Sequence, residues 1–288
     1  MPALPFEVAC GSVAGRDHRI GVPKNRQDDY CVLQTDNMLV AIVADGCGSG
    51  GLASQGDLSV RSQGSSEVGA SLGARLMAHG LMRVASDTGR LTQRNLLQVQ
   101  RHVEAQLRIL AANMGQSLSE TVDRYFLFTL LGAVITEQRA TFFGLGDGLL
   151  FVNGYPVGRE VLQSGEQNQP IYLGYSLTGS ALTDDNPALL DIQIVCDMPT
   201  ADIGHWLLAT DGAADFLDRP SATLPGLDKP LGPINQFWED PRYFANPAAV
   251  TRQLNLAARD WHGPNGNVGG LLHDDTTIVS GRRRPKEE

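Results

Sequence analysis

Four acidic positions in this sequence stand at the edge of an apolar run that has the composition of a buried strand. They are Asp45 after 40–44, Asp147 after 142–146, Asp211 after 206–210, and the pair Asp274-Asp275 before 276–280. A single Asp-Gly pair after a strand is ordinary turn chemistry. When several such strand ends lie side by side, however, their carboxylates stay ionised together only with cations between them.

These residue types favour a phosphoryl-transfer site. Carboxylate oxygens prefer Mg²⁺ or Mn²⁺ to softer metals, and two such ions about 4 Å apart can activate a bridging water for attack on phosphorus. The glycines that follow Asp45 would let a backbone carbonyl approach a cation. The glycine-rich stretch GCGSGG at 46–51 lacks the Lys-Ser/Thr ending of a nucleotide-binding loop, which argues against NTPase chemistry.

The elements that must position these residues are mostly strands. Apolar and β-branched runs predict strands over 6–12, 30–34, 38–44, 125–136, 140–147, 149–154, 191–196, 205–211 and 276–280. Helical spacing of apolar residues predicts helices over 66–85, 96–110 and 250–261, with Ser65 or Ser66 as the first N-cap. We expect the first two helices to form an antiparallel pair. Strand runs interrupted by blocks of helix indicate a layered antiparallel α+β fold.

Composition narrows the function classes. The chain has 288 residues, 42% of them hydrophobic, and a formal net charge of −9, which argues against nucleic acid or an anionic membrane as the partner. Its four cysteines are far apart, as expected in a reducing compartment. No basic n-region with an apolar stretch and no run of about 18 apolar residues occurs. We therefore expect a cytoplasmic protein.

Seven segments follow one another in a specific order along the chain. They are NRQDDY, VAIVADGCGSG, SSEVGASLGARL, FFGLGDGLLFVNG, NQPIYLGYSL, HWLLATDGAADFL and HDDTTIVS. Each is weak alone, but together they resemble the metal-dependent serine/threonine protein phosphatases of type 2C, and more closely the compact bacterial branch. The resemblance implies an α/β/β/α sandwich, with two central antiparallel sheets flanked by antiparallel helix pairs. It also implies a monomeric domain over 1–281, with a charged tail over 282–288.

The implied activity is hydrolysis of phosphoserine and phosphothreonine on proteins by a metal-bridging water, without a covalent phosphoenzyme. The implied cofactors are two Mn²⁺ or Mg²⁺ ions and a weaker third. The implied partners are a phosphorylated protein and a serine/threonine kinase system. A catalytically weak or inactive binding module with the same fold is the alternative, and a phosphatase for small metabolites would share the chemistry.

The resemblance also implies roles for individual residues. Asp45 resembles the aspartate that bridges both metals, and Gly46 the residue that offers its carbonyl. Asp211 and Asp274 resemble the other carboxylates of the first metal, with Asp275 second to Asp274. Asp147 resembles the residue of the third metal site. Asp28 resembles the acidic residue that holds metal-bound water, and the implied catalytic set is Asp28, Asp45, Asp211 and Asp274.

The sequence departs from the family pattern in two places. Gln27 puts an amide where many members have a carboxylate for the second metal, although a shift of one residue would supply Asp28 and Asp29 instead. The family's phosphate-binding arginine is replaced by Pro23, which leaves Lys24, Arg26 and Arg19 as candidates.

Two further residues near these motifs have a chemical and a structural interpretation. His18 is a candidate general acid, although a surface or structural role is the commoner one for a histidine. Cys47 lacks the HCxxxxxR context of a cysteine phosphatase, so we interpret it as a loop residue.

Overall fold

Two five-stranded antiparallel sheets form the centre of the protein. We describe a computed structural model, which covers residues 4–19, 25–47, 65–115, 117–158, 162, 170–179, 186–264 and 266–285. The first sheet has the order β1 (Phe6–Val13), β12 (Thr276–Arg283), β9 (His205–Ala209), β6 (Leu149–Val152) and β7 (Tyr155–Pro156). The second has the order β2 (Asp29–Gln34), β3 (Met38–Gly46), β4 (Phe128–Thr136), β5 (Arg139–Leu145) and β8 (Gln193–Pro199).

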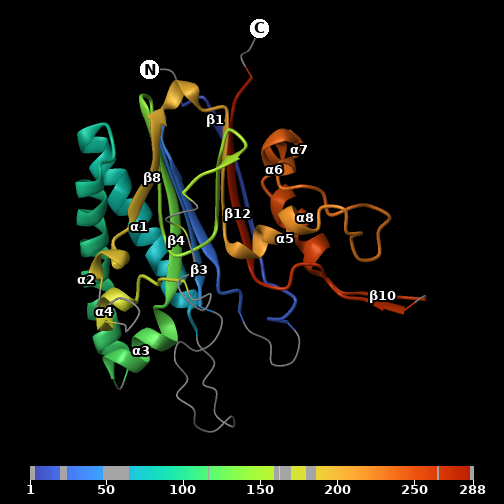
Figure 1. The fold of residues 1–288 in the computed structure, drawn as a ribbon, viewed down its shortest axis with the longest axis horizontal. Helices are drawn as coiled ribbons and strands as arrows, with labels where there is room; N and C mark the ends of the chain where they lie inside the picture. The colour runs from blue at the N-terminus through green and yellow to red at the C-terminus, as the bar shows by residue number, and fades with distance from the viewer. Residues whose placement is uncertain are drawn as a thin grey trace.

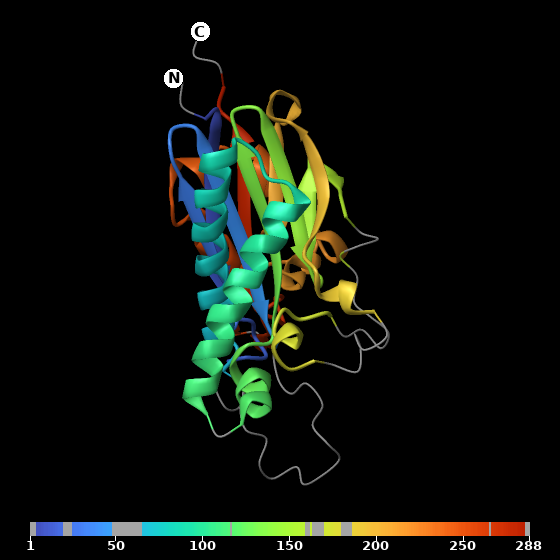
Figure 2. The ribbon, with the colours of Figure 1, turned by 90° about the vertical axis from the view of Figure 1, so that its left-hand side faces the viewer.

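Helices cover both outer faces of this sandwich (Figure 1). The second sheet carries α1 (Glu67–Thr88) and α2 (Gln93–Met114), which lie side by side as the expected antiparallel pair (Figure 2). Four shorter helices cover the first sheet: α5 (Asp215–Asp218), α6 (Gln236–Glu239), α7 (Arg242–Ala245) and α8 (Ala249–Ala258). The predicted four-layer α+β architecture is therefore confirmed, although the second helical layer is not a pair of long helices.

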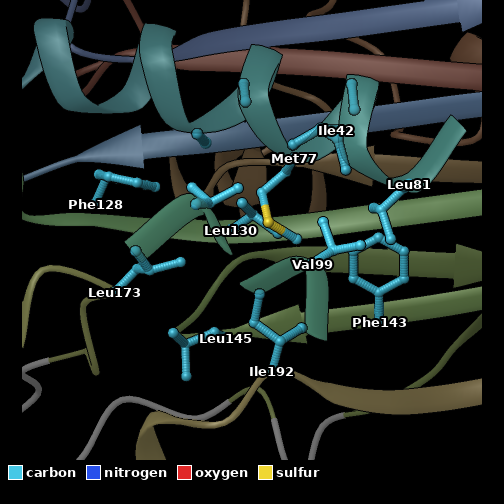
Figure 3. Close-up of a cluster of buried hydrophobic side chains, with 14 of the residues drawn as sticks. Ile42, Met77, Leu81, Val99, Phe128, Leu130, Phe143, Leu145, Leu173 and Ile192 are labelled. Atoms are coloured by element: carbon cyan, nitrogen blue, oxygen red, sulfur yellow. The ribbon is translucent and has the colours of Figure 1, made fainter. Parts of the chain in front are cut away.

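β3 explains why seven uncharged residues precede Asp45. Its side chains alternate between two cores because the strand is buried on both faces. Val40, Ile42 and Ala44 belong to the core under α1 and α2, whereas Leu39 and Val43 belong to the core between the sheets. Figure 3 shows Ile42 beside Met77 and Leu81 of α1. A strand held on both faces gives the residue at its end a fixed position.

Several predicted boundaries are corrected by the structure. The stretch at 118–125 is the helix α3 (Leu118–Tyr125), capped by Ser117, so the following strand begins at Phe128 and not at 125. The last predicted helix ends at Ala258, and Trp261 belongs to the short hairpin of β10 (Trp261–Gly263) and β11 (Gly266–Val268). The expected tail is also shorter, because β12 continues to Arg283.

Among the described residues, no helix combines the length and apolar content that crossing a membrane requires.

Candidate metal centre

Antiparallel pairing brings the acidic strand ends together at one end of the sandwich. Asp29 pairs with Ala44, which places Asp28 beside Asp45. In the other sheet, Ala209 pairs with both Ile278 and Leu149. The turns that carry Asp147, Asp211 and Asp274 therefore lie together at one end of the first sheet. The chain termini lie at the opposite end (Figure 1), where Leu4 donates to the carbonyl of Asp36 in the β2–β3 turn.

Two glycines permit the close approach of these turns. A Cβ on Gly46 would lie 2.8 Å from both the carbonyl oxygen of Gln27 and the hydroxyl of Ser66. A Cβ on Gly212 would lie 2.1 Å from the carbonyl oxygen of Asp275. Side chains at these positions would push the turns apart, so the glycine after each aspartate is required by packing.

Asp45 lies at the centre of the acidic group. Burial raises the pKa of its carboxyl well above the usual range, and the nearby charges of Asp28, Asp211, Asp274 and Asp147, in that order, raise it further. The other four aspartates predicted from the sequence therefore lie within electrostatic reach of Asp45.

Asp28 is the most deeply buried member, with 1% of its surface exposed. Burial, followed by the charge of Asp275, raises its pKa to about 8 despite a hydrogen bond that Thr210 donates. The Thr210 hydroxyl lies 2.7 Å from Asp28 Oδ2 and accepts from the amide of Thr277, which fixes its orientation. In the described structure no N–H or hydroxyl group donates to Asp28 Oδ1, although the Asp28 carboxyl lies in side-chain hydrogen-bonding contact with Asp45.

Asp211 reaches solvent but lies beside other carboxylates. The loss of water around its carboxyl raises its pKa to about 6, and the charges of Asp147 and Asp274 add to this shift. Asp211 also lies in side-chain hydrogen-bonding contact with Asp45. Two carboxyl groups in such contact need a shared proton or a cation between them.

The adjacent aspartates Asp274 and Asp275 have different environments. Asp274 is open to solvent, with 61% of its side chain exposed, whereas Asp275 is 2% exposed. Asp275 Oδ1 accepts from the amide of Gly15 at 2.7 Å, and Oδ2 accepts from the amide of Gln27. Asp274 is therefore available to a cation, while Asp275 is occupied by protein donors.

His18 lies between these two aspartates. Its Nδ1 is 2.9 Å from Asp275 Oδ1, and its Nε2 is 3.8 Å from Asp274 Oδ1. Among the described residues, we find a single group of three or more His, Cys, Asp or Glu side chains whose ligand atoms all lie within 4.8 Å of one another. It consists of His18, Asp274 and Asp275. Because Asp275 already accepts from two backbone amides and faces the imidazole, we interpret the trio as a structural bracket.

The structure also decides which acidic register faces the centre. Asp28 points inward, whereas Asp29 pairs with Arg75 of α1 at 2.7 Å. Burial alone would raise the pKa of Asp29, but the hydrogen bonds from Arg75 and Ser71 lower it overall. Asp29 is therefore engaged with α1 in this structure, which favours the register in which Gln27 and Asp28 face the centre.

The candidates for phosphate binding are largely engaged elsewhere. Arg26 Nε donates to the carbonyl of Asp28 at 2.9 Å. Arg19 donates to the carbonyl oxygens of Gly15 and Ala258. Lys24 lies outside the described residues.

Sequence reasoning missed two hydroxyl residues at this site. Thr210 immediately precedes Asp211, so its place before an Asp-Gly pair was an available signal. Ser66 was expected to cap α1, but its side chain makes no cap hydrogen bond and donates to the carbonyl of Cys47 at 3.0 Å.

The donor set fits a hard divalent cation. The oxygen atoms are carboxylate and carbonyl, and among the described residues no N–H or hydroxyl group donates to the buried Asp28 Oδ1. Burial, followed by four neighbouring carboxylates, raises the pKa of Asp45. A bound cation would give the buried oxygen of Asp28 a partner and would offset the repulsion among the carboxylates around Asp45.

Comparisons with known proteins identify the family and the fold. The family described as Protein phosphatase 2C matches residues 14–254. A bacterial serine phosphatase with one arginine substituted has a TM-score of 0.52 and 11% identity, over 97% of this chain and 99% of its own. PppA, a regulatory component of the T6SS in Pseudomonas aeruginosa, has a TM-score of 0.50 and 17% identity, over 97% and 98%.

No curated protein sequence matches the chain. The two structural similarities show the fold. Since the family match spans most of the sequence, the chain belongs to the protein phosphatase 2C family.

Proposed function

We propose that this protein is an Mn²⁺- or Mg²⁺-dependent phosphatase that hydrolyses phosphoserine and phosphothreonine on proteins. The observation that supports this proposal best is the raised pKa of Asp45, which is surrounded by four other carboxylates. Such a group is costly for a fold to maintain, because its members repel one another when ionised. Cations bound among these carboxylates would offset that repulsion.

The acidic residues would have different roles in binding the cations. Asp45, the carbonyl of Gly46, Asp211 and Asp274 would hold two cations, and Asp147 would serve a weaker third. When bound, the ions would supply positive charge to the phosphate oxygens and lower the pKa of water.

Asp28 would orient and deprotonate the attacking water. Its Oδ2 is fixed by Thr210, and no N–H or hydroxyl group of the described residues donates to its Oδ1. A carboxyl whose pKa is about 8 suits proton transfer near neutral pH.

The proposed substrate is a phosphorylated protein, which would place the enzyme opposite a serine/threonine kinase. Arg19 and Arg26 are candidates for binding the phosphate through the guanidinium N–H groups that do not donate to backbone carbonyls. Lys24 is the third candidate. We propose a single monomeric cytoplasmic domain for this activity.

The direct test is hydrolysis of p-nitrophenyl phosphate and of a phosphothreonine peptide with Mn²⁺, Mg²⁺ or EDTA. We expect activity that requires metal and falls at least 100-fold in Asp211→Asn. A folded wild-type protein that binds Mn²⁺ but hydrolyses neither substrate would contradict the proposal and favour a binding module.

A further inference from the structure

The hairpin of β10 and β11 projects from the body of the protein, at the end of the sandwich that carries the metal centre (Figure 1). Asp274 follows Val268, the last residue of the hairpin, by six residues. Six fully extended residues span at most about 22 Å. A substrate segment of similar length, bound with its phosphate at the metal centre, can therefore reach the hairpin.

The base of the hairpin is fixed to the body of the protein. Asp260, just before β10, accepts from the amide of Gly270 at 2.8 Å and from Arg16 Nε at 2.9 Å. The backbone amide of Arg16 in turn donates to the carbonyl of Leu272 at 2.9 Å, close to Asp274. These bonds join the two ends of the hairpin to each other and to the segment that leads into the metal centre.

The hairpin presents a fixed aromatic side chain. Trp261 has 40% of its surface exposed. A Cβ on Gly226 would lie 2.3 Å from its indole, and one on Gly263 would lie 2.6 Å from it, so both glycines let the ring pack against backbone. Val268 pairs directly with Trp261 across the hairpin, so the two side chains share one face, and Val268 is also exposed.

A cation with unused donors lies beside this aromatic ring. The guanidinium carbon of Arg259 is 5.9 Å from the ring centroid of Trp261. The Nε of Arg259 is buried and has no hydrogen-bond partner among the described residues. By contrast, Arg16, Arg19 and Arg219 of the neighbouring segments all donate to protein acceptors. A buried N–H without an acceptor costs free energy, which an oxygen of a ligand would recover.

These features favour a segment of the phosphorylated protein as the occupant of this face. A second copy of the chain would carry the same net charge of −9 and would be repelled. The exposed parts of one indole and one valine are also far smaller than the ~800 Å² per partner of a stable interface. A weak contact of this size suits a ligand that is already held elsewhere by its phosphate.

We propose that Trp261, Val268 and Arg259 form a docking subsite for the phosphorylated protein, with an apolar side chain on Trp261 and Val268 and an acidic side chain on Arg259. The inference rests on the proposed function. The subsite binds residues to one side of the phosphorylated one, while the phosphate ester is cleaved at the metal centre. Its loss should therefore raise KM for a protein or peptide and leave a small phosphate ester unaffected.

The test compares p-nitrophenyl phosphate with a series of phosphothreonine peptides, all in Mn²⁺. Each peptide carries one adjacent leucine and glutamate in an alanine background, at a different distance on either side of the phosphothreonine. The variants are Trp261→Ala and Arg259→Gln. The matched controls are Tyr155→Ala, which removes an exposed aromatic ring of β7, and Arg252→Gln, which changes an exposed arginine of α8.

We expect the wild type to cleave at least one of these peptides with a kcat/KM about tenfold above that of the all-alanine peptide. Arg259→Gln should remove the part of this preference that depends on glutamate, and Trp261→Ala the part that depends on leucine, both through KM. Hydrolysis of p-nitrophenyl phosphate should be unchanged in both variants. The two controls should behave as wild type with every substrate.

The inference is overturned if no position of the leucine and glutamate improves hydrolysis, or if the two variants retain the preference. An equal loss with p-nitrophenyl phosphate and with the peptides would also contradict it, because the hairpin would then only support the metal centre. If Trp261→Ala fails to fold, Arg259→Gln decides, since that side chain donates to no described residue.

Two other results have a separate meaning. A wild-type dimer that becomes a monomer in Trp261→Ala, measured by analytical ultracentrifugation, would assign this face to a second copy and contradict the inference. A folded wild-type protein that binds Mn²⁺ but hydrolyses neither p-nitrophenyl phosphate nor any peptide would contradict the proposed function and, with it, the docking subsite. Ester hydrolysis without any peptide preference would contradict the subsite alone.

Discussion

His18 Nδ1 lies 2.9 Å from Asp275 Oδ1, and this contact joins the segment after β1 to the start of β12. The same carboxylate accepts from the backbone amides of Gly15 and Gln27. Asp275 thus ties the start of β12 to the segment after β1 and to Gln27, the residue before Asp28. Its role is to hold the turns of the metal centre in place.

This arrangement predicts that Asp275→Asn destabilises the protein in the absence of metal. An asparagine can offer only one carbonyl oxygen, so its NH₂ group must face one of the backbone N–H donors. We expect a loss of about 2–4 kcal/mol in the free energy of unfolding, typical for a buried charged group that loses its hydrogen bonds. Urea denaturation in EDTA measures it.

The neighbouring substitution Asp274→Asn provides the control. Asp274 is exposed, so its change should alter the metal-free stability by no more than about 0.5 kcal/mol while weakening Mn²⁺ binding. Equal destabilisation by the two variants would show that Asp275 has no bracket function.

The raised pKa values predict an unusual pH dependence of stability. The folded protein holds protons on Asp28 up to about pH 8 and on Asp211 up to about pH 6, whereas the unfolded chain releases both near pH 4. Since the folded state binds more protons in this range, metal-free stability should fall as pH rises, by about 1.4 kcal/mol per pH unit for each proton.

Mn²⁺ should reverse this trend, because the cation binds the ionised carboxylates. Thermal unfolding between pH 5 and 8, in EDTA and in Mn²⁺, measures both slopes. If the Tm in EDTA did not fall across this range, the pKa values of these carboxyl groups in the folded protein would not be raised.

Asp45→Asn should separate stability from activity. The substitution replaces a carboxyl that is costly to ionise at this place with an amide that carries no charge, so we expect the free energy of unfolding in EDTA to stay the same or rise by about 1 kcal/mol. Phosphate ester hydrolysis with Mn²⁺ should fall at least 100-fold. A variant that is both inactive and clearly less stable would mean that Asp45 holds the fold through hydrogen bonds and not through metals.

Thr210→Val tests the hydroxyl that fixes Asp28. Loss of a hydrogen bond to a charged group removes about 1.5–3 kcal/mol of stabilisation from the ionised form, which raises its pKa by about 1–2 units. The pH midpoint of Mn²⁺-dependent hydrolysis should rise accordingly. Thr277→Val is the control, since that buried hydroxyl contacts Ser12 and not Asp28. Equal pH profiles for Thr210→Val and wild type would contradict the assignment.

Much of the fold could be predicted from local sequence. The apolar run before Asp45 is a strand buried on both faces, and the spacing of apolar residues located α1 and α2 to within a few residues. The acidic positions of the site were also visible, because an Asp-Gly pair at a strand end is a local signal. Shorter helices such as α3 were missed, since a one- or two-turn helix has too few apolar repeats to show a period.

Tertiary structure alone decided the role of each polar side chain. Whether Asp28 or Asp29 faces inward depends on the pairing of β2 with β3 and on Arg75 of α1. Asp274 and Asp275 are adjacent and chemically identical, yet one is exposed and the other accepts hydrogen bonds from Gly15 and Gln27. Sequence determines which oxygen atoms are present at a strand end. Packing determines which of them are already satisfied by the protein and which are left for a cation.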